Sequence, residues 1–107
     1  MVSNTFQKLN TKKIISETNT TANLFNLYNA AKYDAAQNVA ISIIKEFPKN
    51  QIVWKVLAAI FLIKNNNKKA LEANRQALEL DPFDDEVLNN IALAQQRLGK
   101  FEESEQT

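Results

Sequence analysis

The chain has 107 residues and a formal net charge of +1, and it contains no cysteine, no histidine, one glycine and two prolines. The lack of Cys and His excludes disulfides, thiolate chemistry, a Ser-His-Asp triad and Cys/His zinc sites. With so few turn-forming residues, an all-α fold is favoured over a sheet protein with many tight turns, and we expect no catalytic residue, no metal site and no cofactor.

The N-terminal region, residues 1–16, lacks the apolar stretch of a secretory signal peptide. Its run of Asn, Thr and Ser favours a tail, and an extra helix is the alternative. The longest apolar run, Ile52 to Ile63, is interrupted by Lys55. It is shorter than the about 20 residues that a membrane span needs. We therefore expect a cytoplasmic protein that does not contact a membrane.

Helical patterns follow one another along the rest of the chain. They predict helices at residues 19–31, 33–46, 51–64, 67–80 and 85–98, and a further helix starting at 101. Asn50 and Asp84 each precede a predicted helix and are expected to cap it. Asn65 and Gly99 fall at turns inside hairpins, where both tolerate the left-handed conformation, and Ala31 holds the matching place in the first hairpin.

A 34-residue period relates these elements: Pro48 and Pro82 are one period apart, as are Ala36 and Ala70. The middle copy carries its distinctive residues at Trp54, Leu57, Ala58, Phe61, Ala70, Ala77 and Pro82. This pattern resembles the tetratricopeptide repeat (TPR) consensus, and it departs from the consensus at Asn74, where the family usually has an aromatic residue.

The resemblance covers residues 17–107 and implies an all-α, right-handed TPR helical-hairpin solenoid of about two and a half repeats. The repeats are expected at 17–50, 51–84 and 85–107, the last one truncated. Trp54 should be largely buried between the first two copies, and small residues such as Ala58 and Ala92 should let the helices approach closely. An ordinary helical bundle is the alternative to this fold.

The resemblance also implies a function. Solenoids of this family present a concave surface built from the first helix of each hairpin, which usually binds extended peptides or partner helices. We therefore expect a protein-interaction and scaffold module that binds a peptide or partner protein in its concave groove, with no nucleic-acid partner. The residues expected in this groove are Ile52, Lys55, Ala59, Leu62, Ile63, Asn89, Asn90 and Leu93, with Thr21, Phe25, Tyr28, Glu86 and Gln96 on the same face.

Lys55 and Asn90 carry finer resemblances. Family members that clamp a C-terminal carboxylate use a Lys and an Asn on successive inner helices, although Ala59 stands where a further Asn would be expected. In the repeat arm of O-linked N-acetylglucosamine transferases, an asparagine like Asn90 holds the peptide backbone, because an amide can donate and accept at once. A solvated polar position is the alternative for Asn90.

Three further expectations concern the whole chain. The stretches Glu46-Phe47-Pro48, Trp54-Lys55-Val56-Leu57 and Leu88-Asn89-Asn90-Ile91-Ala92 resemble the repeat segment before bacterial glycosyltransferase or sulfotransferase domains, which implies a substrate-recognition or assembly arm of a larger enzyme as the alternative function.

Residues 1–70 carry ten lysines and three acidic residues, a net +7. Because the lysines are scattered and no stacking aromatics alternate with them, nucleic-acid binding is the least favoured of the three functions considered. The truncated last hairpin predicts fraying beyond Gly99 or self-association through this end.

Overall fold

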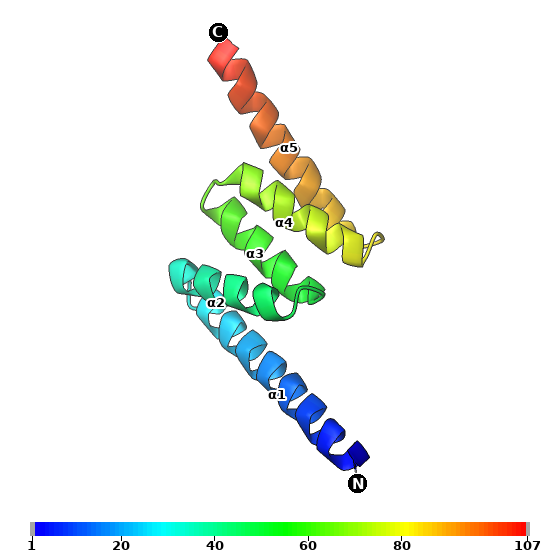
Figure 1. Ribbon diagram of the computed structural model, residues 1–107. Helices are drawn as coiled ribbons and strands as arrows, with labels where there is room; N and C mark the ends of the chain where they lie inside the picture. Colours follow the sequence, from blue (N-terminus) through cyan, green and yellow to red (C-terminus); the bar gives the residue numbers. More distant parts are fainter. Residues whose placement is uncertain (1, 107) are drawn as a thin grey trace.

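The computed structural model describes residues 2–106, with side chains described for residues 12–100, and this part of the chain is built from helices alone. They are α1 (Val2–Asn29), α2 (Tyr33–Glu46), α3 (Gln51–Ile63), α4 (Asn67–Leu80) and α5 (Asp85–Gln106). In Figure 1, α1 and α2 form one antiparallel hairpin, α3 and α4 form the next, and α5 packs on α4. The helices stack along an axis of 69 Å, with extents of 29 and 19 Å across it. The fold is thus the predicted all-α solenoid of helical hairpins.

The turns inside the two hairpins repeat the 34-residue period in their backbone geometry. Ala31 N–H donates to the Tyr28 carbonyl, and Asn65 N–H donates to the Leu62 carbonyl, both at 3.0 Å. Ala31 and Asn65 have φ angles of 59° and 61°. The left-handed turn predicted at Asn65 is confirmed, and the alanine adopts the same conformation although its Cβ makes it unfavourable by about 1–2 kcal/mol. The hydrogen-bond pattern of the turn thus outweighs the local preference of the residue.

The two predicted N-caps are also confirmed. The side-chain Oδ1 of Asn50 accepts a hydrogen bond from Val53 N–H at 3.3 Å, at the start of α3. One period later, Oδ1 of Asp84 accepts from Val87 N–H at 3.2 Å in the first turn of α5. Each cap satisfies a backbone donor that has no partner within its own helix.

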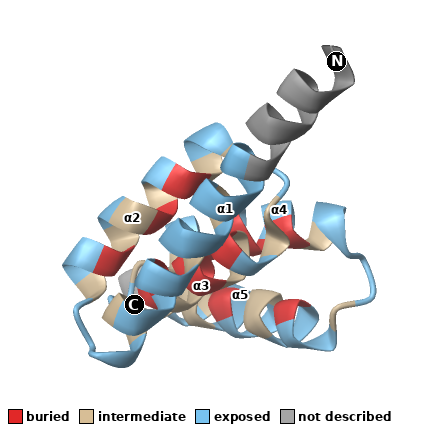
Figure 2. Cartoon of the chain, turned by 90° about the horizontal axis from the view of Figure 1, so that it is seen from below, coloured by how far each residue is buried: buried red, intermediate tan, exposed pale blue. Residues whose placement is uncertain are grey.

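The core centres on α3, which lies between α2 and α4 and also contacts α1. Figure 2 shows that the buried residues lie on the helix faces turned toward one another. Buried alanines on three helices keep the helix axes close, at Ala36, Ala40, Ala58, Ala70, Ala73 and Ala77. Ala92, which matches Ala58 one period later, is exposed, because α5 has no following helix against this position.

Trp54 differs from its prediction, because it is only half-buried rather than largely buried. Its ring packs against the edge of the core, and Nε1 donates to the Pro48 carbonyl at 2.8 Å. A hollow of about 450 Å³ remains beside it, lined by Trp54, Leu57, Phe61, Lys69, Glu72, Ala73 and Gln76. The indole therefore holds the turn before α3 and stays partly open to solvent.

The predicted turn at Gly99 and the new helix from residue 101 are wrong, because α5 runs unbroken from Asp85 to Gln106. Gly99 lies inside this helix, and a Cβ added there would meet no atom within 4 Å. A second helix folding back must bury an apolar face to offset its ordering, and the seven residues 101–107 give less than two helical turns for this. Continuing α5 instead adds one backbone hydrogen bond per residue. The side chain of Phe101, expected in the last hairpin, lies outside the described residues.

At the other end of the chain, α1 runs unbroken from Val2 to Asn29, so residues 2–16 are the N-terminal part of this helix rather than a tail or a separate helix. Phe6 and Leu9 lie outside the described side chains. Ile14 and Ile15 are 66% and 53% exposed, so this part of α1 extends past the body of the solenoid.

Candidate functional site

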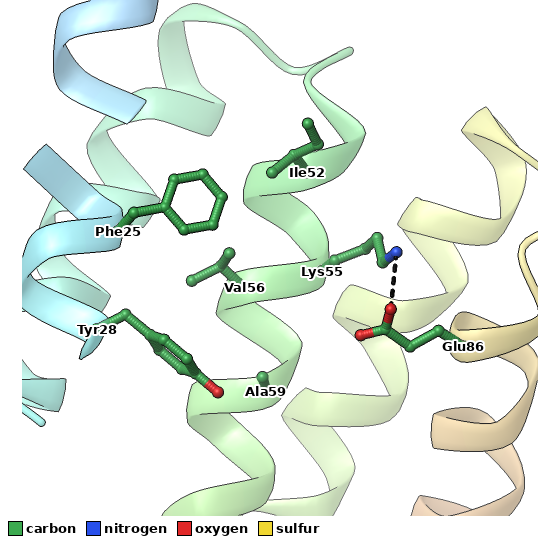
Figure 3. Close-up of a pocket in the computed structure, with 7 residues that line it drawn as sticks. All are labelled: Phe25, Tyr28, Ile52, Lys55, Val56, Ala59 and Glu86. Carbon is green, nitrogen blue, oxygen red and sulfur yellow. Dashed lines mark ion pairs between the residues drawn. The ribbon is translucent and has the colours of Figure 1, made fainter. Parts of the chain in front are cut away.

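A hollow of about 320 Å³ opens on the side of α3 that faces α1 and the start of α5. Three helices contribute to its walls, which are mainly apolar and aromatic. The lining residues are Phe25, Tyr28, Ile52, Lys55, Val56, Ala59 and Glu86 (Figure 3). We call this the central hollow.

A second hollow, of about 360 Å³, lies next to it between α1 and the start of α3. Its lining residues are Glu17, Thr18, Thr21, Ala22, Phe25, Asn50 and Ile52. Because Phe25 and Ile52 line both spaces, the two are direct neighbours. We call this second space the N-terminal hollow, and the two together the inner groove.

The structure brings part of the predicted site together. Ile52, Lys55 and Ala59 line the central hollow. Four residues expected on the same face also line the groove, namely Thr21, Phe25, Tyr28 and Glu86. These residues of α1, α3 and the first turn of α5 lie around the same space, and their role in binding stays a prediction.

Five predicted residues line neither hollow. Leu62 packs against the hydrophobic core, so it is half-buried rather than open to the groove. Ile63 is 49% exposed beyond the end of the central hollow. On α5, Asn89 and Leu93 are exposed and Asn90 is half-buried, outside both hollows. Only the first turn of α5 reaches the groove.

The prediction missed five lining residues, Glu17, Thr18, Ala22, Asn50 and Val56. Glu17 precedes Thr21 by four residues and so lies on the same face of α1, which the helical period could have shown. Asn50 was recognised only as a cap, although its side chain also borders the N-terminal hollow. Val56 is 8% exposed, and it follows Lys55 at the boundary between the groove and the core.

Lys55 is held by two carboxylates. Its Nζ lies 2.9 Å from Oδ2 of Asp84 and 3.2 Å from Oε2 of Glu86. Gln51 Nε2 donates to the same Asp84 oxygen at 3.1 Å. The hydrogen bond to Asp84 raises the pKa of Lys55 above its usual 10.5, and the same bond from Lys55 lowers the pKa of Asp84 below 3.8. The positive charge of Lys55 is thus already balanced by two carboxylates where the side chain borders the groove. This disfavours its use as a clamp for a peptide carboxylate.

The described residues contain no cluster of acidic side chains suited to a metal ion. Among the same residues, no helix is both long and apolar enough to cross a membrane. What the groove offers is an open, mixed apolar and polar surface, which suits binding.

Comparisons with known proteins agree with this architecture. Residues 73–106, from α4 through α5, match the tetratricopeptide repeat family model. Among 26 matching solved chains, a mutant of MamA superposes with a TM-score of 0.73 and 24% identity, covering 82% of this chain. This chain spans 64% of that chain's length. No curated protein matches.

These findings show the fold to be an all-α TPR solenoid. They do not test the expected link to glycosyltransferase or sulfotransferase domains, which stays a prediction.

Proposed function

We propose that this chain is a non-catalytic interaction module whose inner groove binds an extended segment of a partner protein. The observation that carries the proposal is that two neighbouring hollows share the exposed apolar side chains of Phe25 and Ile52. Phe25 is 37% exposed and Ile52 is 52% exposed. Apolar side chains gathered in a concavity, with polar groups beside them, are typical of a binding surface.

The walls of the groove are preformed by the solenoid. Val56 is buried beneath it, and Tyr28 packs against Tyr33 with ring centroids 5.7 Å apart. Side chains held in this way lose little freedom on binding. Since the groove is shallow and open, we expect dissociation constants of about micromolar order.

The proposal includes Asn89, Asn90 and Leu93 as an extension of the surface along α5. A segment that leaves the central hollow past Glu86 would follow this helix. The Asn90 amide could then hydrogen-bond the backbone of the segment. Binding that depends on Ile52 but not on Asn90 would restrict the site to the two hollows.

The test is to select peptides from a displayed random library on this chain and to measure their affinity by calorimetry. Ile52→Ser should weaken the selected peptides by about five- to tenfold, because it removes about one to two buried methylene equivalents and exposes a polar group. Ile14→Ser is the matched control, since Ile14 is exposed on α1 and lines neither hollow. Equal affinities for the Ile52 variant and the unmodified chain, with helicity intact in both, would refute the groove as the binding surface.

A further inference from the structure

We propose that the N-terminal hollow accepts a basic side chain, Lys or Arg, from the partner segment, with Glu17 as its charge partner. This rests on the proposed function of the inner groove and specifies the partner: an extended segment with a basic residue flanked by apolar ones. The observations behind it are the charge of this hollow and the 34-residue register, which places a lysine, Lys55, one period after Thr21.

The residues around Lys55 correspond, one period earlier, to residues of the N-terminal hollow. Thr21 stands in the place of Lys55, and Asn50 in the place of Asp84. The backbone of the two regions is equivalent, because the same cap and turn hydrogen bonds recur in both. One period later, the matching residues Ile52, Lys55, Val56, Ala59 and Glu86 line the central hollow, and the Lys55 side chain there extends to Asp84 and Glu86. The N-terminal hollow has the short Thr21 in place of this lysine, so it lacks the cation that its counterpart contains.

The charge of the hollow suits a cation. Glu17 is the one charged residue among those lining it, and it is half-buried. No basic side chain of the described residues forms an ion pair with Glu17. Its place corresponds to Gln51, which donates to the Lys55–Asp84 cluster in the next repeat. In the N-terminal hollow the carboxylate is that of Glu17, inside α1. Beside Lys55 it is that of Asp84, the N-cap of α5.

The adjoining surface supports the same choice of partner. The rings of Phe25 and Tyr28 form the α1 side of the central hollow, across from Lys55 and Glu86 (Figure 3). Aromatic rings attract a nearby cation through their faces. Although residues 1–70 carry a net +7, Lys55 is the one lysine lining the groove, and its charge is balanced by Asp84 and Glu86. An acidic segment would meet no free base there.

The experiment uses basic, neutral and acidic pools of synthetic peptides with equal length, equal apolar content and amidated C-termini. The unmodified chain should retain the basic pool best, and added salt should weaken this retention. Glu17→Gln should lower affinity for the basic pool by about three- to fivefold, the range of one partly exposed ion pair. Glu79→Gln makes the same charge change on the exposed face of α4 and should have no effect.

Thr21→Lys is the sharper variant, because it should place an ammonium group inside the N-terminal hollow, as Lys55 does beside the central hollow. The new lysine lies four residues after Glu17, the spacing that favours a Glu–Lys pair on a helix. It should lower affinity for the basic pool by about tenfold or more. Asn19→Lys adds the same charge at an exposed position of α1 that lines neither hollow, and it controls for simple repulsion. Because Asn19 follows Glu17 by two residues, the control lysine does not face that carboxylate on the helix.

The outcomes separate this inference from the proposed function. If Ile52→Ser weakens all three pools alike and neither Glu17→Gln nor Thr21→Lys alters the ranking of the pools, the groove binds peptides but the basic preference is refuted. Preferential retention of the acidic pool by the unmodified chain would also overturn it. If Ile52→Ser weakens none of the pools, the proposed function itself fails. If the Thr21→Lys variant loses binding of the basic pool and the Asn19→Lys variant keeps it, the N-terminal hollow is supported as the site for the basic side chain.

Discussion

Asn74 offers a direct test of the packing between α3, α4 and α5. Its side chain is fully buried in α4, and neither the amide oxygen nor the amide nitrogen has a hydrogen-bond partner among the described residues. Buried polar groups without partners destabilise a fold by about 1–3 kcal/mol. The surrounding face of α4 is apolar and small, with Ala70, Ala73 and Ala77 all buried.

Asn74→Leu should therefore stabilise the protein. Leucine has a similar shape, removes the unpaired polar atoms and has a higher helix propensity than asparagine. Imperfect fit of the branched side chain can cost up to about 1.5 kcal/mol. Setting this cost against the relief of about 1–3 kcal/mol, we expect a net gain of about 1–2 kcal/mol.

The assay is urea unfolding followed by circular dichroism at 222 nm. With a denaturant slope of about 1–2 kcal/mol/M for a chain of this size, the midpoint should rise by about 1 M. Asn38→Leu on the exposed face of α2 is the control, and its effect should stay within about 0.5 kcal/mol. A lower midpoint for Asn74→Leu would mean that the amide is hydrogen-bonded in solution, and the packing argument would fail.

Three further substitutions test other features of the structure. Ala31→Gly should raise the free energy of unfolding by about 1 kcal/mol, measured by the same titration, because glycine adopts the observed φ of 59° without steric cost. Gly99→Ala should stabilise by about 0.5–1 kcal/mol if α5 is continuous, and destabilise if residue 99 forms a left-handed turn. The Lys55–Asp84 pair should make stability depend on pH at both extremes. Since the pKa of Asp84 is lowered in the fold, its contribution to the free energy of unfolding is present above about pH 4 and is lost as pH falls through the folded pKa. Since the pKa of Lys55 is raised, its contribution to the same free energy is lost as pH rises above about 10.5. Asp84→Asn should flatten the acid limb of a midpoint-against-pH curve, whereas Asp34→Asn should barely change it, because Asp34 is 92% exposed.

Much of the fold could be predicted because the repeat constrains many residues in the same register. Caps at Asn50 and Asp84 and the turn at Asn65 follow from local chemistry, which the structure keeps. The bounds of α2, α3 and α4 lie within one residue of those predicted from the helical pattern, whereas α1 and α5 extend further toward the chain ends. Local signals suffice wherever each helix has its neighbours.

The errors arise where tertiary context is missing or decides the outcome. Gly99 has the right residue type for a turn, but a turn forms only when the chain after it can pack back. Trp54 and Ala92 have consensus identities, yet they lack covering neighbours on one side. Leu62 shows the opposite effect: it was predicted to face the groove, but it packs against the hydrophobic core and is more buried than expected. Periodicity gives the direction of a side chain, and its exposure depends on what lies opposite.

The way α5 is attached shows which part of the solenoid should open first. It packs on α4, and its fully buried side chains among residues 85–100 are Val87 and Ala94. Two polar contacts join this region to α3. Near its start, Lys55 forms a salt bridge with Asp84, and near residue 100, Arg97 Nη1 donates a hydrogen bond to the Leu62 carbonyl at 3.3 Å. Because Asp84 both caps α5 and holds Lys55, protonating it weakens the helix start and the contact between repeats together. Amide exchange at acid pH should therefore accelerate in α5 before it does in α3, whose neighbours on both sides keep it covered. The electrostatic cluster at the edge of the central hollow thus also links the start of α5 to α3.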